Sequence, residues 1–167
     1  VLFRKAKSNT TSLVTLTPGD GLFGFNIGYS VNGLVDEVEV RAMDVGAGKA
    51  ITYSATRSGD LSLGSKAASL LKKSKKVYID PTAQSNAMAK VRVESLMETM
   101  TYRFGQFEGN CVGIPELVPG RFITIDGLGS GVNNTFYINK VVHSVTQDGY
   151  RTYLTGCAPS LPSSSAF

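Results

Sequence analysis

The feature that most constrains the fold is a series of short strand-like runs and turns in the last third of the chain. Phe122–Ile125 is a β-branched and aromatic run that stops at Asp126-Gly127, and a longer strand is predicted from Thr135 to Val145. Asp148-Gly149 then turns the chain into a return strand that begins at Tyr150. This pattern predicts an antiparallel hairpin within a mainly β structure.

A rigid turn precedes these strands. Pro115 and Pro119 fix φ and remove two backbone donors, and Gly113 and Gly120 permit positive φ on either side of them. We therefore expect the chain to reverse between two strands here.

The first third of the chain is predicted to be a meander of about four strands, separated by Gly-, Asn- and Pro-rich turns. Phe23 and Phe25 alternate with Gly24 and Asn26, which indicates a half-buried strand. The two rings would form part of a core face. A stacking platform for single-stranded nucleic acid is the alternative, and it is disfavoured because no Lys or Arg alternates with them.

Residues 57–76 have no sustained hydrophobic period and are predicted to form a long connecting arm. The arm ends in four closely spaced lysines, and a solvated linker is the favoured interpretation of them. The sharper alternative is a contact with nucleic acid or another polyanion. The residues of this contact would be Lys72, Lys73, Lys75 and Lys76.

A helix is predicted over residues 81–104, with Asp80 as its cap and Pro81 at its first position. The apolar residues on one face of it are Ala89, Val93, Leu96, Met97, Met100 and Phe104. Together the patterns predict a mainly β (α+β) fold, with a barrel or curled sheet of about eight short strands and one amphipathic helix. The helix would cover the barrel mouth or one face.

The sequence offers few residues for catalysis or metal binding. His143 is the only histidine of the 167 residues, and it lies mid-strand without an Asp or Asn at a spacing that would orient it toward Cys111 or Cys157. One histidine and two scattered cysteines also give no zinc spacing, and free thiols are favoured over a disulfide. We therefore expect a protein that is not an enzyme and has no cofactor.

Composition excludes other classes. The net charge is only +4, and no run approaches the ~20 apolar residues of a membrane span. The first residues lack the apolar stretch of a signal peptide. Because they also lack an initiator Met, we expect a piece of a longer protein.

One order of motifs is shared with a known family. The helix ending near Arg103-Phe104 is followed by GNCVGIPELVPGRFITIDGLGS, TFYINKVVHSV and DGYRT, and this order resembles the C-terminal part of the phage late control protein D family. That family includes baseplate hub proteins of contractile phage tails and the hub region of VgrG spike proteins. Leu34–Tyr53 is also similar, so the resemblance covers most of Thr11–Leu154. The motif residues are Gly113, Pro115, Pro119, Gly120, Gly127, Gly129, Tyr137 and His143.

The resemblance implies a tail-tube-like β-barrel domain over 12–157, which includes the arm 57–76 and the helix 81–104. Residues 1–11 would be poorly ordered or paired with an upstream segment, and 158–167 would be a tail. It further implies a homotrimer when the upstream domain is present. The trimer would form a ring that joins a tail tube to a spike, and DNA or cargo would pass through this ring. The location would be a virion tail baseplate or a prophage-derived particle, assembled in the bacterial cytoplasm. A small nucleic-acid-binding barrel is the alternative, and the kind of injection machine stays open.

Overall fold

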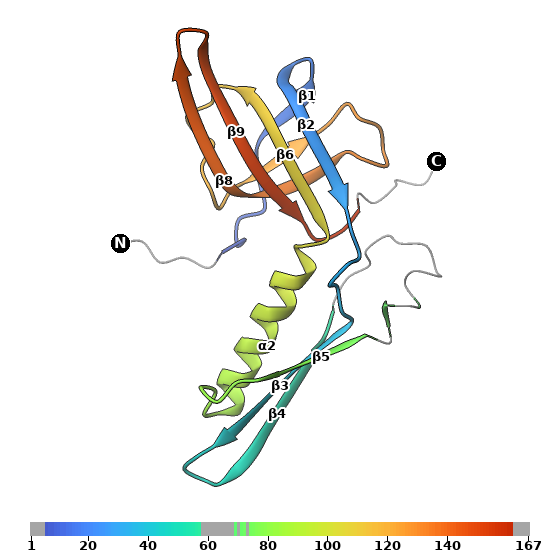
Figure 1. Ribbon diagram of the computed structural model, residues 1–167, viewed down its shortest axis with the longest axis vertical. Coiled ribbons are helices and arrows are strands. Elements are labelled where there is room, and N and C mark those ends of the chain that lie inside the picture. The colour runs from blue at the N-terminus through green and yellow to red at the C-terminus, as the bar shows by residue number, and fades with distance from the viewer. Residues whose placement is uncertain (1–5, 58–68, 70, 73, 162–167) are drawn as a thin grey trace. The chain divides into compact units, whose positions relative to one another are not determined.

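The computed structural model describes residues 6–57, 69, 71–72 and 74–161, and the chain divides into two compact units. Unit 1 contains the residues up to Ser30 and those from Phe104 onward, and unit 2 is Val31–Arg103. The elements are labelled in Figure 1. They are β1 Ser12–Pro18, β2 Gly21–Tyr29, β3 Glu37–Asp44, β4 Lys49–Thr56, β5 Lys75–Ile79, α2 Asn86–Thr101, β6 Gly105–Val112, β7 Phe122–Ile125, β8 Asn134–Thr146 and β9 Gly149–Ala158.

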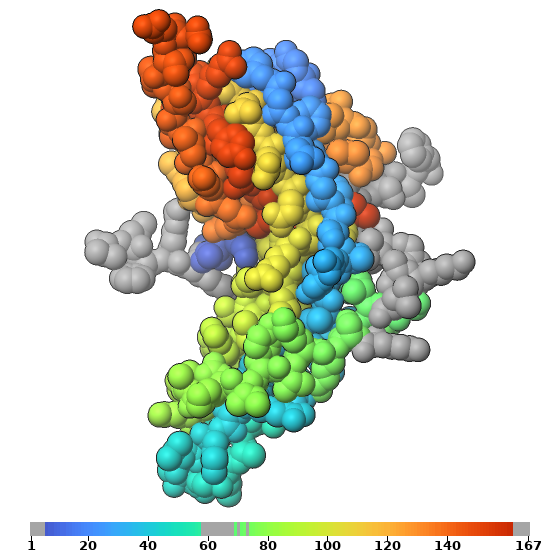
Figure 2. All heavy atoms as spheres, in the orientation of Figure 1, coloured from blue at the N-terminus to red at the C-terminus, as the bar shows by residue number. Residues whose placement is uncertain are grey.

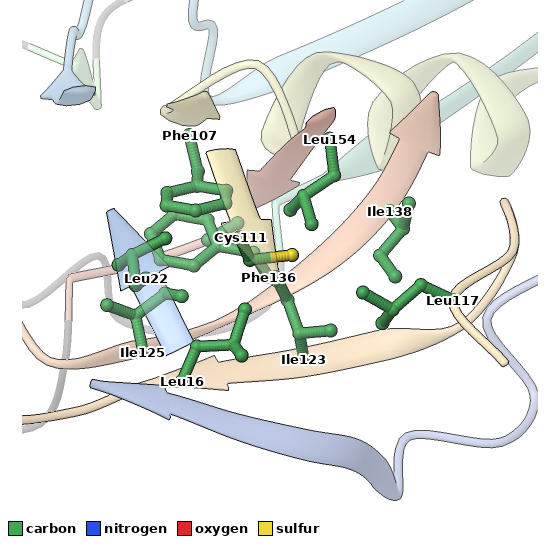
Figure 3. Close-up of a cluster of buried hydrophobic side chains, with 11 residues drawn as sticks. Leu16, Leu22, Phe107, Cys111, Leu117, Ile123, Ile125, Phe136, Ile138 and Leu154 are labelled. Carbon is green, nitrogen blue, oxygen red and sulfur yellow. The ribbon is translucent and has the colours of Figure 1, made fainter. Parts of the chain in front are cut away.

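Unit 1 is a closed barrel with the strand order β1-β2-β6-β9-β8-β7. Its four long strands pair antiparallel in the order β2, β6, β9 and β8, whereas β1 pairs parallel with β7. Burial alternates strictly along β6, so that one face of the strand fills the interior. The interior side chains come from all six strands and from the loop between β6 and β7 (Figure 3). They are Leu16, Leu22, Phe107, Cys111, Leu117, Ile123, Ile125, Phe136, Ile138, Leu154 and Ala158.

Unit 2 is a three-stranded sheet, ordered β4-β3-β5, with α2 packed on one face. Val38 and Val40 of β3 are fully buried against Ala89 and Val93 of the helix. The alternation of apolar and charged residues along β3 therefore gives the sheet one face for the helix and one charged face.

The mainly β fold with a barrel and an amphipathic helix is confirmed, but the strands are distributed differently from the prediction. The barrel contains six strands rather than about eight, and β3, β4 and β5 form the separate sheet of unit 2. The residues predicted to form one domain over 12–157 thus fall into two units. The physical reason is that α2 buries the apolar face of β3, so these side chains are removed from water without packing inside the barrel. Hydrophobic periodicity identifies an apolar face but not the element that covers it.

The helix is shorter than the predicted 81–104. It begins after Ser85, whose side chain accepts a hydrogen bond from the Met88 N–H at 3.3 Å, and it ends at Thr101. Asp80 instead stabilises the preceding turn through the backbone N–H of Thr82 at 3.0 Å. Ser85 is an equally good cap by residue type, and it lies closer to the first buried helix residue, Ala89.

Strand β5 is fixed to β3 by a group of charges on the open face of the sheet. Lys75 Nζ lies 2.9 Å from Glu37 Oε1 and 2.6 Å from Glu39 Oε2, and Arg41 Nε lies 2.6 Å from Glu39 Oε1. The hydrogen bonds from Lys75 and Arg41 hold the pKa of Glu39 below its usual value. Glu39 is only 7% exposed, so its carboxylate depends on these partners rather than on water.

We predict that Glu39→Gln destabilises unit 2 at neutral pH and that the loss disappears in acid. A carboxyl whose pKa is lowered by folding stabilises the protein above its unfolded pKa, and this contribution is lost as the pH falls through the folded pKa. Thermal unfolding followed by circular dichroism from pH 7 to pH 3 measures the effect. Glu94→Gln is the control, because Glu94 is exposed and lies 3.9 Å from Lys90. Equal melting temperatures for Glu39→Gln and the unmodified protein at pH 7 would contradict the prediction.

Candidate functional site

The thiols and the imidazole, which the sequence offers as candidates for nucleophilic chemistry, form hydrogen bonds to other groups rather than to one another. The Cys111 thiol donates to the carbonyl oxygen of Thr152 at 3.4 Å, and the Cys157 thiol donates to Asn139 Oδ1 at 3.5 Å. Neither cysteine forms a disulfide. Burial raises the pKa of Cys111 to about 11 and raises that of Cys157 as well, so both thiols stay protonated at neutral pH. Figure 3 shows the Cys111 sulfur among the side chains of the barrel core.

His143 holds the loop between β6 and β7 against the hairpin of β8 and β9. Its Nε2 lies 3.0 Å from the carbonyl oxygen of Leu117, which can only accept, so Nε2 carries the proton. In the neutral ring Nδ1 is then the acceptor, and it receives the Tyr150 hydroxyl at 2.8 Å. Thr152 Oγ1 lies 3.1 Å from the same Nδ1 and accepts the N–H of Ile114 at 3.2 Å. We call these five residues the loop clasp.

The glycine and proline motif of this loop has two different physical roles. Gly120 has φ 88, as its sequence context predicts, whereas Gly113 does not adopt a positive φ. Gly113 is instead required for space, because a Cβ at this position would overlap the ring of Tyr150. Pro115 and Pro119 are exposed on either side of Leu117, which is fully buried. The loop is thus a rigid turn that inserts one leucine into the core.

The other motif residues shape the barrel wall. Gly127 and Gly129 have φ 83 and 96 in the loop between β7 and β8, so this is a β–β loop as the sequence indicates. A Cβ on Gly127 would also lie 2.6 Å from Thr17 Cγ2. Tyr137 of β8 packs edge-on against Phe122 of β7 with 5.2 Å between ring centroids.

The lysine cluster does not form one free positive surface. Lys73 lies outside the described residues, and Lys72 is exposed in a turn. Lys75 is bound by the carboxylates described above, while Lys76 Nζ lies 5.2 Å from the centroid of the Tyr78 ring. The geometry therefore gives little support to the polyanion contact.

One edge of β8 is unpaired over most of its length. β8 has 13 residues and β7 has 4, and in the described part of the chain β7 pairs only with Asn134–Tyr137. The Tyr150 carbonyl accepts the N–H of Gly113 and so faces β6. Because antiparallel ladders alternate, the polar backbone groups of Val145, opposite Tyr150, face away from β9. By the same alternation, the backbone N–H and C=O groups of Val141 and His143 also point away from β9, toward this open edge.

A second open edge lies on β2. β1 pairs with β2 only at Gly21 and Leu22 in the described residues. The N–H of Ser30 donates to the Phe104 carbonyl, so the even-numbered residues of the strand point their polar groups toward β6. The backbone groups of Phe25 and Ile27 therefore point away from the sheet.

Exposed apolar side chains flank both edges. Phe23 is 61% exposed and Phe25 41%, which corrects the expectation that these rings belong to a core face. The register shifts between Leu22 and Gly24, so the alternation of the sequence does not continue across the shift. Arg151 lies over the Phe23 ring, 5.6 Å from its centroid. On the other edge Val145 is 79% exposed.

The directions of the strands make the two edges complementary. The order β2-β6-β9-β8 contains three antiparallel pairings, so β2 and β8 run in opposite directions. When copies are rotated about an axis along the strands, β8 of one copy meets β2 of the next in antiparallel orientation. Figure 2 shows the outer surfaces of β2, β6 and β9 side by side in this sheet.

Pairing of strand edges between copies is part of the structural hypothesis from the sequence, but the strands that carry the open edges were not predicted, although a signal for one of them was present. The predicted strand 135–145 is much longer than its neighbour 122–125, and such a mismatch leaves backbone groups unpaired. The open edge of β2 had no comparable signal, because strand pairing is not visible in one sequence.

The described residues provide neither a metal cluster nor a membrane-spanning helix. No group of three or more His, Cys, Asp or Glu side chains in them is placed to hold a metal ion. None of their helices has the length and apolar character needed to cross a membrane.

Comparison with known proteins gives matches in structure only. No protein-family model and no curated protein matches this chain. A tail protein from Neisseria meningitidis MC58 matches with a TM-score of 0.64 and 12% identity, over 92% of this chain and 46% of its own. The prophage MuSo2 43 kDa tail protein from Shewanella oneidensis matches with a TM-score of 0.66 and 13% identity, over 91% of this chain and 46% of its own.

A chain of the virion of a native gene transfer agent particle also matches, with a TM-score of 0.55 and 13% identity over 98% of this chain and 35% of that one. The chain thus spans less than half the length of these proteins. At such low identity the matches establish a shared fold.

We predict that Gly113→Ala lowers the free energy of unfolding by about 1–3 kcal/mol, because the added Cβ forces the Tyr150 ring out of place. Urea unfolding measures the change. Gly131→Ala is the matched control, since a Cβ on Gly131 would meet no atom within 4 Å and its φ is not positive. Equal losses in the two variants would show that the contact with Tyr150 is not responsible.

We predict that His143→Phe lowers the free energy of unfolding by about 1–2 kcal/mol, because the carbonyl of Leu117 and the hydroxyl of Tyr150 each lose a hydrogen-bond partner. His143→Gln keeps an amide donor for the carbonyl and should recover part of this loss. Urea unfolding at neutral pH is again the measurement. A His143→Phe variant as stable as the unmodified protein would show that the loop clasp does not stabilise the fold.

Proposed function

We propose that this chain is a structural component of a phage-type tail or related injection machine, in which it forms part of a ring. The finer role we propose is a baseplate hub or spike base that joins the tail tube to the spike, as a homotrimer. The family resemblance of the sequence supports this role. The fold shared with two tail proteins and with a chain of a gene transfer agent particle agrees with it.

The observation that carries the proposal is the pair of open edges on the four long strands of the barrel, where β1 and β7 do not cover β2 and β8. An unpaired edge with exposed apolar side chains promotes association, and monomeric proteins normally shield it with charges, prolines or bulges. The β8 edge from Val141 to Val145 contains no proline, and of its side chains only His143 can carry charge. Each copy would offer one edge to each neighbour, which is the head-to-tail contact that closes into a ring.

The proposed partners follow from this role. They are further copies of the chain, a tail tube protein and a spike protein, with DNA or cargo passing the ring. The proposed location is the virion tail baseplate or a prophage-derived particle, assembled in the bacterial cytoplasm. Function here is geometric, and the role does not call on the buried thiols or on His143 as a nucleophile.

We predict that Val145→Pro abolishes self-association without unfolding the barrel. The Val145 N–H points to the open edge, so proline removes a donor between copies but none of the bonds to β9. Analytical ultracentrifugation over a concentration series measures the mass, and circular dichroism checks the fold. Val145→Ser is the matched control, because it removes the apolar side chain and keeps the N–H.

The unmodified chain and Val145→Ser should both form closed oligomers, while Val145→Pro stays monomeric with an unchanged melting temperature. If the proline variant assembles as the unmodified chain does, the β8 edge at Val145 does not pair between copies. An unmodified chain that remains monomeric up to its solubility limit would count against the proposed ring.

A further inference from the structure

Unit 1 contains a small polar cavity beside the residues that precede β7. Its volume is about 230 Å³, and it lies between the segment Ala6–Asn9, the loop residues Pro119–Arg121 and Tyr137. Sites for drug-sized ligands are usually about 300 Å³ or larger, so this cavity suits a single small group.

The residues that line the cavity carry positive charge and no negative charge. Lys7 and Arg121 contribute two cations, and the remaining polar side chains are those of Ser8, Asn9 and Tyr137. Lys7 Nζ lies 5.4 Å from the centroid of the Tyr137 ring. Hydroxyl and amide groups beside two cations form a donor-rich surface that favours an anion.

Three other arginines of the described residues lie beside carboxylates. Arg41, Arg57 and Arg92 each lie within 4.0 Å of a carboxylate oxygen. Arg121 is partly buried, its Nε is shielded from solvent, and this atom has no hydrogen-bond partner. A buried donor without an acceptor is costly, and the cost is greater for a charged group.

A fixed backbone holds Arg121 at this place. Its carbonyl accepts the N–H of Ile138 at 2.8 Å, and the N–H of Gly120 donates to the Ile138 carbonyl at 3.0 Å. These bonds extend the β7–β8 pairing, so the cationic side chain starts from a rigid strand end rather than a free loop. Lys7 also lines this cavity, and its own backbone has φ 58, in the left-handed region.

We propose that this cavity binds one oxyanion group, a phosphate or a carboxylate, between Lys7 and Arg121. The planar guanidinium pairs well with the two oxygens of either group, and the ammonium of Lys7 adds a second charge. The oxyanion would supply the negative charge that the lining lacks. Its source is a free anion or an acidic side chain of a partner, and both share this chemistry. The site does not depend on ring formation.

The test is a titration of isotope-labelled protein with sodium phosphate, followed by NMR at constant ionic strength. The backbone signals of Gly120 and Arg121 and the Arg121 side-chain Nε–H should shift and saturate. Arg121→Gln should weaken binding at least about ten-fold, because it removes a charge-assisted bidentate contact. Lys49→Gln, an exposed lysine outside the cavity, should leave the affinity unchanged. Sodium acetate in a parallel titration distinguishes the two sources.

Saturation with phosphate alone favours a free phosphate, and saturation with both anions favours a site that also accepts acidic side chains. Shifts that are linear, or equal in sodium chloride, would overturn the proposal. An affinity that Arg121→Gln leaves unchanged would overturn it too. Because the titration is done on dilute protein, its outcome is independent of whether the chain forms rings.

Discussion

The structure of unit 1 depends on the requirement that backbone N–H and C=O groups find hydrogen-bond partners. β8 meets this requirement on one side through β9, which pairs with it from Tyr137 to Thr146 with a bulge after Ile138. On its other side the four residues of β7 cover only the first part of the strand. The remainder of β8 and most of β2 are left with open edges, whose backbone groups bond only to water in a single copy and which the proposed assembly would pair.

The fixed path of the loop between β6 and β7 explains why β7 does not extend to cover β8. Residues 113–121 cross from the end of β6 to the start of β7, and this path is fixed at three points. Gly113 lies against the Tyr150 ring, the Leu117 carbonyl is bound by His143, and Gly120 is bonded to Ile138. The loop uses the length that a longer β7 would need, and Leu117 fills the core in its place. A single histidine is thus accounted for as a structural residue.

The sequence was sufficient to predict the element types but not their grouping. The alternation along β3, the apolar stripe of α2 and the Asp148-Gly149 hairpin were visible as local patterns, and the structure contains them. The division into a six-stranded barrel and a separate sheet was not predictable, because it depends on which apolar faces meet.

The burial of individual side chains was also only partly predictable. The exposure of Phe23 and Phe25 was not predictable from their alternation with Gly24 and Asn26, because a register shift lies between Leu22 and Gly24. For Gly113, composition suggested backbone freedom, whereas the operative constraint is the ring of Tyr150, a residue distant in sequence. In both cases the decisive neighbour lies on another strand.

The most direct measurement for the central claim is hydrogen exchange of individual backbone amides at low and high protein concentration. We expect the N–H groups of Val141, His143 and Val145 to exchange fast in the dilute chain and slowly in the concentrated one. Val142 and Ser144, which face β9, should be protected at both concentrations. Slow exchange of the first three amides in the dilute monomer, or no change with concentration, would contradict the claim that this edge is open and pairs between copies.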